Sequence, residues 1–308
     1  MNDSIVISAS CADVASPALL PSAGQTAAAP FGTFSVFSLD HTAFETASPA
    51  ERGRHTRVSH RLSSLVPRLL DRAGLAPQAL AGSSCGIVSG SVYGCSQVYD
   101  MHRRLKRFGP RGVDAVRFAQ ATHNYPVSAC AIEYGIEGPC LSILNAETAG
   151  LDALQCAHDW LRAGRCTRVL VTAYEDFASP TGDHLAGRAR PHLCSGQGYG
   201  EAMVVVLLET ARAAAARGRT DLPVLTSIGT VPPAKPGLSV RADSETTQGF
   251  APRNLDFLGA GGLLALHDLL NSPAAGQPGR VQWRIAAAAQ GVSGVAAGIG
   301  IGQMEDCL

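Results

Sequence analysis

The sequence predicts an α/β fold in which parallel strands are covered on both faces by helices. Between residues 57 and 217, apolar residues at helical spacing alternate with short β-branched runs, and glycines mark several junctions. Alternating strands and helices favour crossover connections, which make successive strands parallel. The composition agrees, because 33 glycines and only 6% aromatic residues suit helices packed closely against sheets.

Composition also excludes several classes of function. The chain of 308 residues has a formal net charge of zero and no basic run, so we expect no nucleic-acid partner. Its longest apolar runs are too short to span a bilayer, and its N-terminus lacks a secretory signal pattern, so we expect a cytoplasmic protein with no membrane contact. Nine cysteines without metal-ligand spacing indicate reduced thiols and no metal site.

The N-terminal third begins loosely and becomes regular. Residues 5–9 are strand-like, and the rest of residues 1–30 is rich in Pro, Ala, Ser and Gly, so this segment is partly loose, with a frayed end as the alternative. Residues 31–40 are a second strand or an ordered arm. Residues 57–73 form a helix that ends at Gly74. Its apolar residues share one face: Val58, Leu62, Leu65, Val66, Leu69 and Leu70.

The middle of the chain alternates strands and helices as far as residue 217. The expected strands are residues 83–90, 140–144, 167–173 and 203–208. The expected helices are residues 93–108, 118–134, 151–162 and 210–217. A long polar loop with His184 and His192 covers residues 175–197.

Residues 138–150 are the stretch around which the rest is organised. They read Gly-Pro-Cys-Leu-Ser-Ile-Leu-Asn-Ala-Glu-Thr-Ala-Gly, which predicts a turn, a buried strand and a sharp exit into a helix. Such an elbow holds one side chain at a helix N-terminus, where backbone N–H groups favour negative charge. Glu147 occupies that point. A Cys or Ser there would suggest a nucleophile, a part that a carboxylate cannot easily play.

The elbow resembles the active-site region of β-ketoacyl synthases, in which Gly-Pro, a short strand and Thr-Ala-Cys-Ala-Ser/Ala-Gly lead into a helix. Three further segments resemble that family in the same order: a glycine-bounded strand at residues 86–94, a helix at 124–135 and Gly-Tyr-Gly-Glu-Ala at 198–202. The resemblance runs from about residue 50 to residue 210. It implies a thiolase-like layered α/β/α/β/α fold, with Glu147 at the position of the nucleophilic Cys.

The resemblance also suggests a shortened second half. Residues 259–266 resemble the helix start after the family's Gly-His-x-x-Gly-Ala-Ala-Gly motif, and residues 281–289 and 295–301 resemble its last two strands. The interval between Glu201 and Gly259 is shorter than in the full-length family. We therefore expect three parts, namely a segment 1–30, an N-terminal ketosynthase-like half 31–218 and a truncated C-terminal half 219–308.

The groups that the family's condensation chemistry needs are missing together. That chemistry requires a thiolate, two polar enolate stabilisers, usually His, and an oxyanion hole. Here Glu147 replaces the thiolate, and residues 210–258 hold no Glu-Ala-His-Gly-Thr-type segment. Asp256 falls on the second His position, and Ala251 falls on the family's nearby Lys. Condensation by this chain alone is not expected.

The resemblance instead implies a chain-length factor, which pairs with a catalytic ketosynthase as a heterodimer and shapes the tunnel in which a polyketide grows, for example a polyene. An acyl carrier protein is the second implied partner, and no cofactor is needed because phosphopantetheine arrives on that carrier. The usual replacement for the Cys in such subunits is Gln, so Glu departs from the pattern and suggests a structural or interface role for Glu147.

In the family, the helix after the first glycine-rich turn lies at the dimer interface and reaches the partner's tunnel. By position, the chain-length determinants would be Cys95, Val98, Tyr99 and His102. The alternative for each of these residues is ordinary core or interface packing.

Three other functions stay open. A malonyl-carrier-protein decarboxylase, or priming ketosynthase, could use Glu147 if His184 or His192 folded over it. An acyltransferase or hydrolase could use Cys194 beside His192. A non-enzymatic subunit in a fatty-acid or pigment pathway would share the missing Cys and the dependence on a partner.

Overall fold

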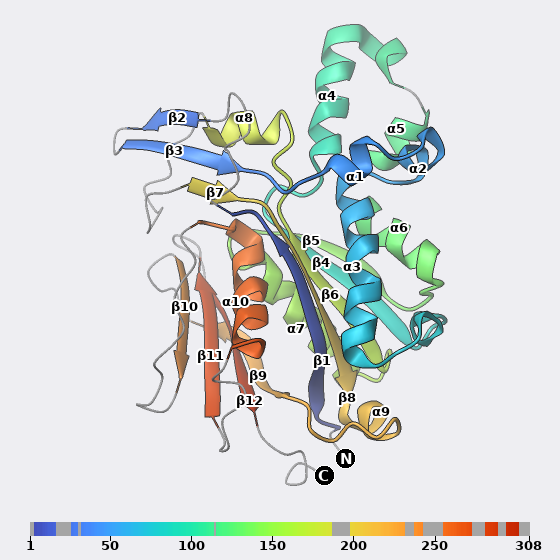
Figure 1. Cartoon of the computed structure of the whole chain (residues 1–308), viewed down its shortest axis with the longest axis vertical. Coiled ribbons are helices and arrows are strands. Elements are labelled where there is room, and N and C mark those ends of the chain that lie inside the picture. The colour runs from blue at the N-terminus through green and yellow to red at the C-terminus, as the bar shows by residue number, and fades with distance from the viewer. Residues whose placement is uncertain are drawn as a thin grey trace.

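The computed structural model describes residues 3–16, 26–29, 32–113, 115–186, 198–231, 237–242, 255–272, 281–288 and 294–301. Its main feature is a nine-stranded sheet in the order β10-β11-β12-β9-β1-β8-β6-β4-β5 (Figure 1). The strands are β1 (Ile5–Val14), β4 (Cys85–Ser91), β5 (Cys140–Leu144), β6 (Arg168–Tyr174), β8 (Ala202–Thr210), β9 (Val224–Val231), β10 (Gly237–Ala242), β11 (Val281–Ala288) and β12 (Gly294–Ile301). A second sheet joins β2 (Thr26–Ala29), β3 (Gly32–Phe37) and β7 (Gly198–Gly200).

The prediction of a parallel sheet is wrong for most of its length. Only β4 pairs in parallel, with β5 on one side and β6 on the other. All the other pairs in the long sheet are antiparallel, including β6 with β8 and β8 with β1. Only five residues separate β11 from β12, which is too few for the crossover that a parallel pair needs.

One outer face of the sheet is covered by α3 (Arg57–Ala73) and α6 (Tyr125–Tyr134). The bounds of α3 agree with the predicted helix, and all six apolar residues named for its face are buried. Thr56 caps its start by accepting a hydrogen bond from the Ser59 backbone N–H, and Gly74 ends it with φ of 66°. This helix anchors one side of the fold on β1 and β8.

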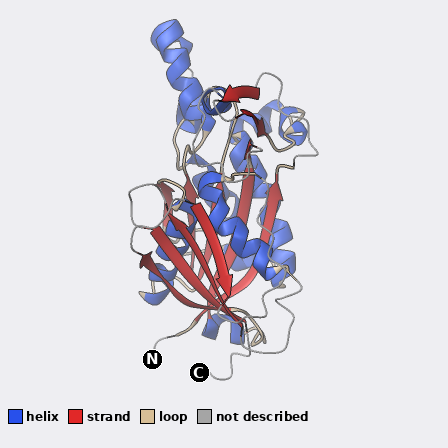
Figure 2. Cartoon of the chain, turned by 90° about the vertical axis from the view of Figure 1, so that its left-hand side faces the viewer, coloured by secondary structure: helices blue, strands red, loops and turns tan. Residues whose placement is uncertain are grey.

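Two helices lie between the two parts of the sheet. α7 (Ala149–Arg162) and α10 (Gly261–Leu270) share one apolar core with strands β4, β6 and β8 on one side and β9, β11 and β12 on the other. Figure 2 shows the twisted strands with helices on both sides. The layers therefore alternate helix, sheet, helix and sheet. In the described part of residues 219–301, α10 is the single α-helix.

The remaining helices are short except for α4 (Ser96–Phe108), which projects beyond the sheet at one end of the molecule (Figure 1). The others are α1 (Thr42–Glu45), α2 (Pro49–Arg54), α5 (Ala115–Gln120), α8 (Thr181–Ala186), α9 (Ala211–Ala215) and the 3₁₀ turns η1 (Pro77–Leu80), η2 (Gly109–Gly112) and η3 (Leu258–Ala260). Among the described residues, no helix is long and apolar enough to cross a membrane.

Several predicted elements need correction. Residues 118–134 form two helices, α5 and α6, because Pro126 starts a new helix and cannot continue an earlier one. The expected buried strand at 140–144 is β5, an edge strand with Leu141 43% exposed. The loop 175–197 contains α8.

The strand expected at residues 5–9 is confirmed and is longer than predicted. Residues 5–9 belong to the longer strand β1, which lies in the middle of the sheet between β8 and β9, so the frayed-end alternative is wrong. Residues 31–40 do contain a second strand, β3. The division into halves at residue 218 stays a prediction.

Candidate functional site

The elbow between β5 and α7 is the starting point of the candidate site. Glu147 lies half-buried in its turn, directly before Thr148, the N-cap residue of α7. Asp152 organises this turn, because its Oδ2 accepts hydrogen bonds from Asn145 Nδ2 at 2.8 Å and from Thr148 Oγ1 at 2.7 Å. The predicted strand, elbow and helix are therefore present, with Glu147 at the helix start.

Two glycines let other elements approach the elbow. A Cβ added at Gly90, on β4, would lie 2.1 Å from the Ala149 carbonyl oxygen. A Cβ added at Gly150 would lie 2.7 Å from the Gly259 carbonyl oxygen. Since real Cβ atoms do not come so close to backbone, both positions need glycine. The elbow is thus packed against the end of β4 and against η3.

Asp256 lies three residues before Gly259 and has a local structural task. Its Oδ1 accepts a hydrogen bond from the Leu258 backbone N–H at 2.8 Å, which caps the turn into η3. Its backbone pairs with β7, donating to Gly198 O and accepting from Gly200 N, both at 3.0 Å. The structure therefore places Asp256 between β7 and η3, whose Gly259 packs against the elbow. Ala251 lies outside the described residues.

Glu175 is the main residue of this region that sequence reasoning missed. It follows the end of β6, is fully buried, and its carboxyl group lies beside Gly259. Its Oε1 accepts hydrogen bonds from Val92 N at 2.7 Å and from Gly259 N at 3.1 Å. Burial raises the pKa of Glu175 to about 8, although these donors act in the opposite direction. The available signal was a pair of adjacent acids directly after a buried strand.

The second acid of that pair, Asp176, belongs to a buried ionic network. Arg57, at the start of α3, forms ion pairs with both Asp176 and Glu201, and His41 Nε2 lies 3.0 Å from Glu201 Oε2. Burial alone would raise the pKa of Asp176, but Arg57 and the Ser96 N–H hold it below its usual value. The network ties α3, β6, α4 and β8 together at the end of the sheet that carries the elbow.

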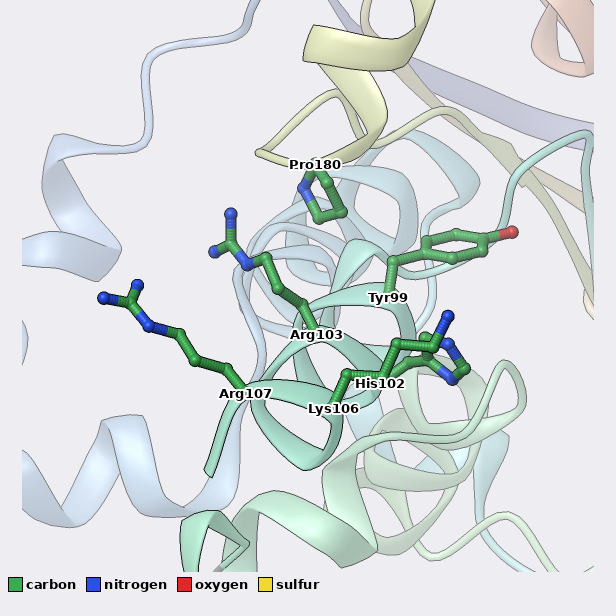
Figure 3. Close-up of a pocket in the computed structure, with 6 residues that line it drawn as sticks. All are labelled: Tyr99, His102, Arg103, Lys106, Arg107 and Pro180. Carbon is green, nitrogen blue, oxygen red and sulfur yellow. The ribbon is translucent and has the colours of Figure 1, made fainter. Parts of the chain in front are cut away.

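The four predicted chain-length determinants separate into two groups. Cys95 precedes α4 and is buried in the core, which raises the pKa of its thiol to about 12. Val98 is half-buried. Tyr99 and His102 line an open groove of about 490 Å³ (Figure 3). The structure therefore brings Tyr99 and His102 together and places Cys95 among packing residues.

The groove beside α4 combines apolar and cationic side chains. It is completed by Arg103, Lys106, Arg107 and Pro180. Arg103 is held by Asp100 Oδ1 at 2.7 Å and by Ser179 Oγ at 3.2 Å. Tyr99 is also oriented, because its hydroxyl donates to the Tyr93 carbonyl oxygen at 2.9 Å and its ring centroid lies 6.0 Å from that of His123.

No activated thiol is found in the described part of the chain. Its seven cysteines are all free, and burial raises the pKa of each of them. Cys194 and His192 lie outside the described residues. His184 lies on α8, with its ring 6.4 Å from that of Tyr93. Within the described ranges, no group of His, Cys, Asp and Glu side chains could hold a metal ion.

An exposed apolar surface lies along the free edge of the sheet. Ile132 on α6 is 83% exposed, and Leu141 and Leu144 on β5 are 43% and 42% exposed. α6 and β5 are neighbours, and β5 is the last strand of the sheet. An edge strand with apolar side chains is suited to pairing with another chain.

Comparison with known proteins places this site in a family. A family model described as "Beta-ketoacyl synthase, N-terminal domain" matches residues 16–214. The chain is 30% identical over 189 residues to polyketide synthase GfsB of Streptomyces halstedii, a match that covers 58% of this chain and 3% of the relative. It is 28% identical over 197 residues to the tetracenomycin polyketide synthase ketoacyl synthase alpha subunit of Streptomyces glaucescens. This match covers 56% of this chain and 46% of the relative. The matches span less than half the length of either relative.

Solved structures confirm the fold class. A type II polyketide synthase acyl-carrier protein in complex with its ketosynthase bound to the hexaketide matches with a TM-score of 0.69 and 14% identity, covering 98% of this chain and 100% of that chain. The ishigamide ketosynthase/chain length factor matches with a TM-score of 0.55 and 16% identity, covering 75% and 64%. At these identities the likeness concerns the fold, and it confirms the predicted thiolase-like α/β architecture.

Proposed function

Because the chain belongs to the β-ketoacyl synthase family, we propose that it is a chain-length factor of a type II polyketide synthase, a subunit without its own nucleophile. The observation that carries this proposal is Glu147 in the β5–α7 elbow, the position at which the sequence resemblance puts the family's Cys. A carboxylate at this point cannot form the thioester by which a ketosynthase accepts an acyl chain.

Two further observations support a subunit that does not condense by itself. Asp256, which the resemblance puts at the second His position, accepts a hydrogen bond from the Leu258 N–H and so caps the η3 turn. The described cysteines all have raised thiol pKa values, so none of them offers a substitute nucleophile. In this proposal, Asp256 stands in place of an enolate stabiliser and Glu147 in place of the acyl acceptor.

The partner in this proposal is a catalytic ketosynthase subunit that docks on the β5 edge. Ile132, Leu141 and Leu144 supply an apolar contact surface there, and the unpaired side of β5 supplies backbone hydrogen-bond groups. Tyr99 and His102 on the projecting helix α4 are the proposed tunnel residues, and Val98 is a weaker candidate because it is not among the residues that line the groove. Cys95 serves as core packing.

An acyl carrier protein would deliver the growing chain on its own phosphopantetheine, so the subunit needs no cofactor. The proposal places the complex in the cytoplasm, where the free cysteines of the described part would stay reduced. The product and its length follow from the tunnel and from the partner.

The test is co-expression with the catalytic ketosynthase encoded beside this chain, with the purification tag on this chain. We expect the two to co-purify one to one, and intact-mass analysis with malonyl-loaded carrier protein to show polyketide growth only when both are present. The proposal fails if this chain purifies alone and releases CO₂ to leave acetyl-carrier protein, with loss of that activity in Glu147→Ala. That outcome would identify a decarboxylase.

A pair of variants tests the docking surface itself. Ile132→Asp puts a charge on the most exposed apolar side chain beside β5 and should abolish co-purification. Arg212→Glu is the matched control, because Arg212 is 85% exposed on α9, at the far end of the sheet (Figure 1). If Ile132→Asp still co-purifies as well as Arg212→Glu, the ketosynthase docks elsewhere.

A further inference from the structure

Three backbone N–H groups converge on one buried point beside the elbow. Val92 and Tyr93 contribute two of them, from the turn between β4 and α4, and Gly259 in η3 contributes the third. The Ser91 hydroxyl completes the set. These donors come from segments more than 160 residues apart in the sequence, so only the fold brings them together.

The carboxyl group of Glu175 occupies this point. Oε1 makes the two shorter contacts, 2.7 Å to Val92 N and 3.1 Å to Gly259 N. Oε2 makes the two longer ones, 3.3 Å to Tyr93 N and 3.2 Å to Ser91 Oγ. Among the described residues, no Arg, Lys or His side chain forms an ion pair with Glu175. In this part of the chain, three backbone N–H groups and one hydroxyl hold the carboxyl group.

We propose that these donors form a built binding site for a small carboxyl compound, which the chain fills with its own Glu175 and which opens when that side chain is removed. The filled site joins the turn that begins α4 to the η3 segment that follows Asp256. Glu175 is thereby a positioning residue for both segments. The existence of the site does not depend on the proposed function. The importance of the site for positioning α4, the helix that carries Tyr99 and His102, does rest on the proposed function.

The geometry also defines the ligand. Glu175→Ala removes the side chain beyond Cβ, a methylene and a carboxyl group, which together match acetate. The site has little room to spare, because a Cβ at Gly259 would lie 2.9 Å from Glu175 Oε1 and 3.1 Å from Ala149 Cβ. Acetate and formate should therefore enter, and the bulkier pivalate should not.

The test is thermal unfolding of the full chain carrying Glu175→Ala, in its complex with the ketosynthase if that is how it purifies. At pH 5, where part of the added acetate is protonated as the buried Glu175 carboxyl is, acetate at several times its Kd should raise the Tm of this variant by about 2–4 °C over an equal concentration of chloride. Wild type should not respond, because its site is filled. The matched control is Thr172→Ala, also fully buried on β6, which leaves a cavity without converging N–H groups and should not respond either.

Hydrogen exchange locates the effect. Acetate should slow amide exchange of Glu175→Ala in peptides that cover Val92, Tyr93 and Gly259, and leave the other core peptides unchanged. An equal Tm shift in all three proteins, a shift produced equally by pivalate, or no change at these amides would overturn the proposal. If Glu175→Ala does not fold, Glu175→Gln decides instead. Its amide keeps one acceptor oxygen and replaces the other by an NH2 group. Faster exchange at part of these three amides, with the other core amides unchanged, supports the site, and unchanged exchange at all three overturns it.

Discussion

Replacing Glu175 by Gln should change how the stability of the protein depends on pH. The side chain is fully buried, and burial raises the pKa of its carboxyl group to about 8, from 4.5 when exposed. Because the folded pKa is the higher one, Glu175 supports the fold fully below pH 4.5, and this contribution is lost as the pH rises through 8. At about 1.36 kcal/mol per pH unit, the loss amounts to about 5 kcal/mol.

That loss is a large share of the stability of a typical domain, about 5–15 kcal/mol, so denaturation in urea from pH 5 to pH 9 should detect it. Glu175→Gln cannot ionise, and its unfolding free energy should fall less over this range than that of wild type.

The other titratable groups around Glu175 should not mask this effect. Burial raises the pKa of Tyr174 and of Tyr99, so both stay neutral over this range. Asp176 stays ionised beside Arg57. The difference between the wild-type and Glu175→Gln curves of unfolding free energy against pH therefore reports the ionisation of Glu175 alone. Parallel curves from pH 5 to pH 9 would refute the reasoning, because they would mean that Glu175 ionises freely in the fold.

Three further changes have defined outcomes. Glu147→Cys should react with iodoacetamide, since a helix N-terminus favours the thiolate, yet it should not condense malonyl units by itself because Asp256 remains. Gly90→Ala should destabilise the fold by about 1–3 kcal/mol or more in urea unfolding, because its Cβ would lie 2.1 Å from the carbonyl oxygen of the elbow. Ala substitution of Tyr99, which lines the groove, should shift the mass of the polyketide made by the two-subunit complex without reducing co-purification.

Each of these has a result that contradicts it. Condensation by Glu147→Cys alone would mean that the missing groups are supplied elsewhere in the chain. An unchanged urea midpoint for Gly90→Ala would show that the backbone of the elbow shifts at little cost to accommodate the added methyl group. If neither Tyr99→Ala nor His102→Ala changes the mass of the product, the groove is not part of the polyketide tunnel.

Much of the local structure could be predicted from the sequence. The helix α3 has the predicted bounds and the predicted buried face, because its periodicity, its Thr56 cap and Gly74 all lie within one segment. The elbow at Glu147 was recognisable for the same reason, since a strand, a turn and a helix follow each other directly. The order of family motifs added the thiolase-like fold class.

Long-range arrangement was decided only by the tertiary structure. Residues 140–144 have the pattern of a buried strand, yet β5 lies at a sheet edge, because strand order depends on which segments pair and not on the strand's own residues. The mixed direction of the sheet has the same origin.

Glu175 is the clearest case. Its sequence neighbours suggest an ordinary polar loop, and its role arises from Val92 and Gly259, which lie 83 and 84 residues away. Local patterns determine helices, strands and turns because these depend on neighbouring residues. A buried carboxyl group held by backbone N–H donors depends on contacts between distant segments, which exist only once the chain has folded.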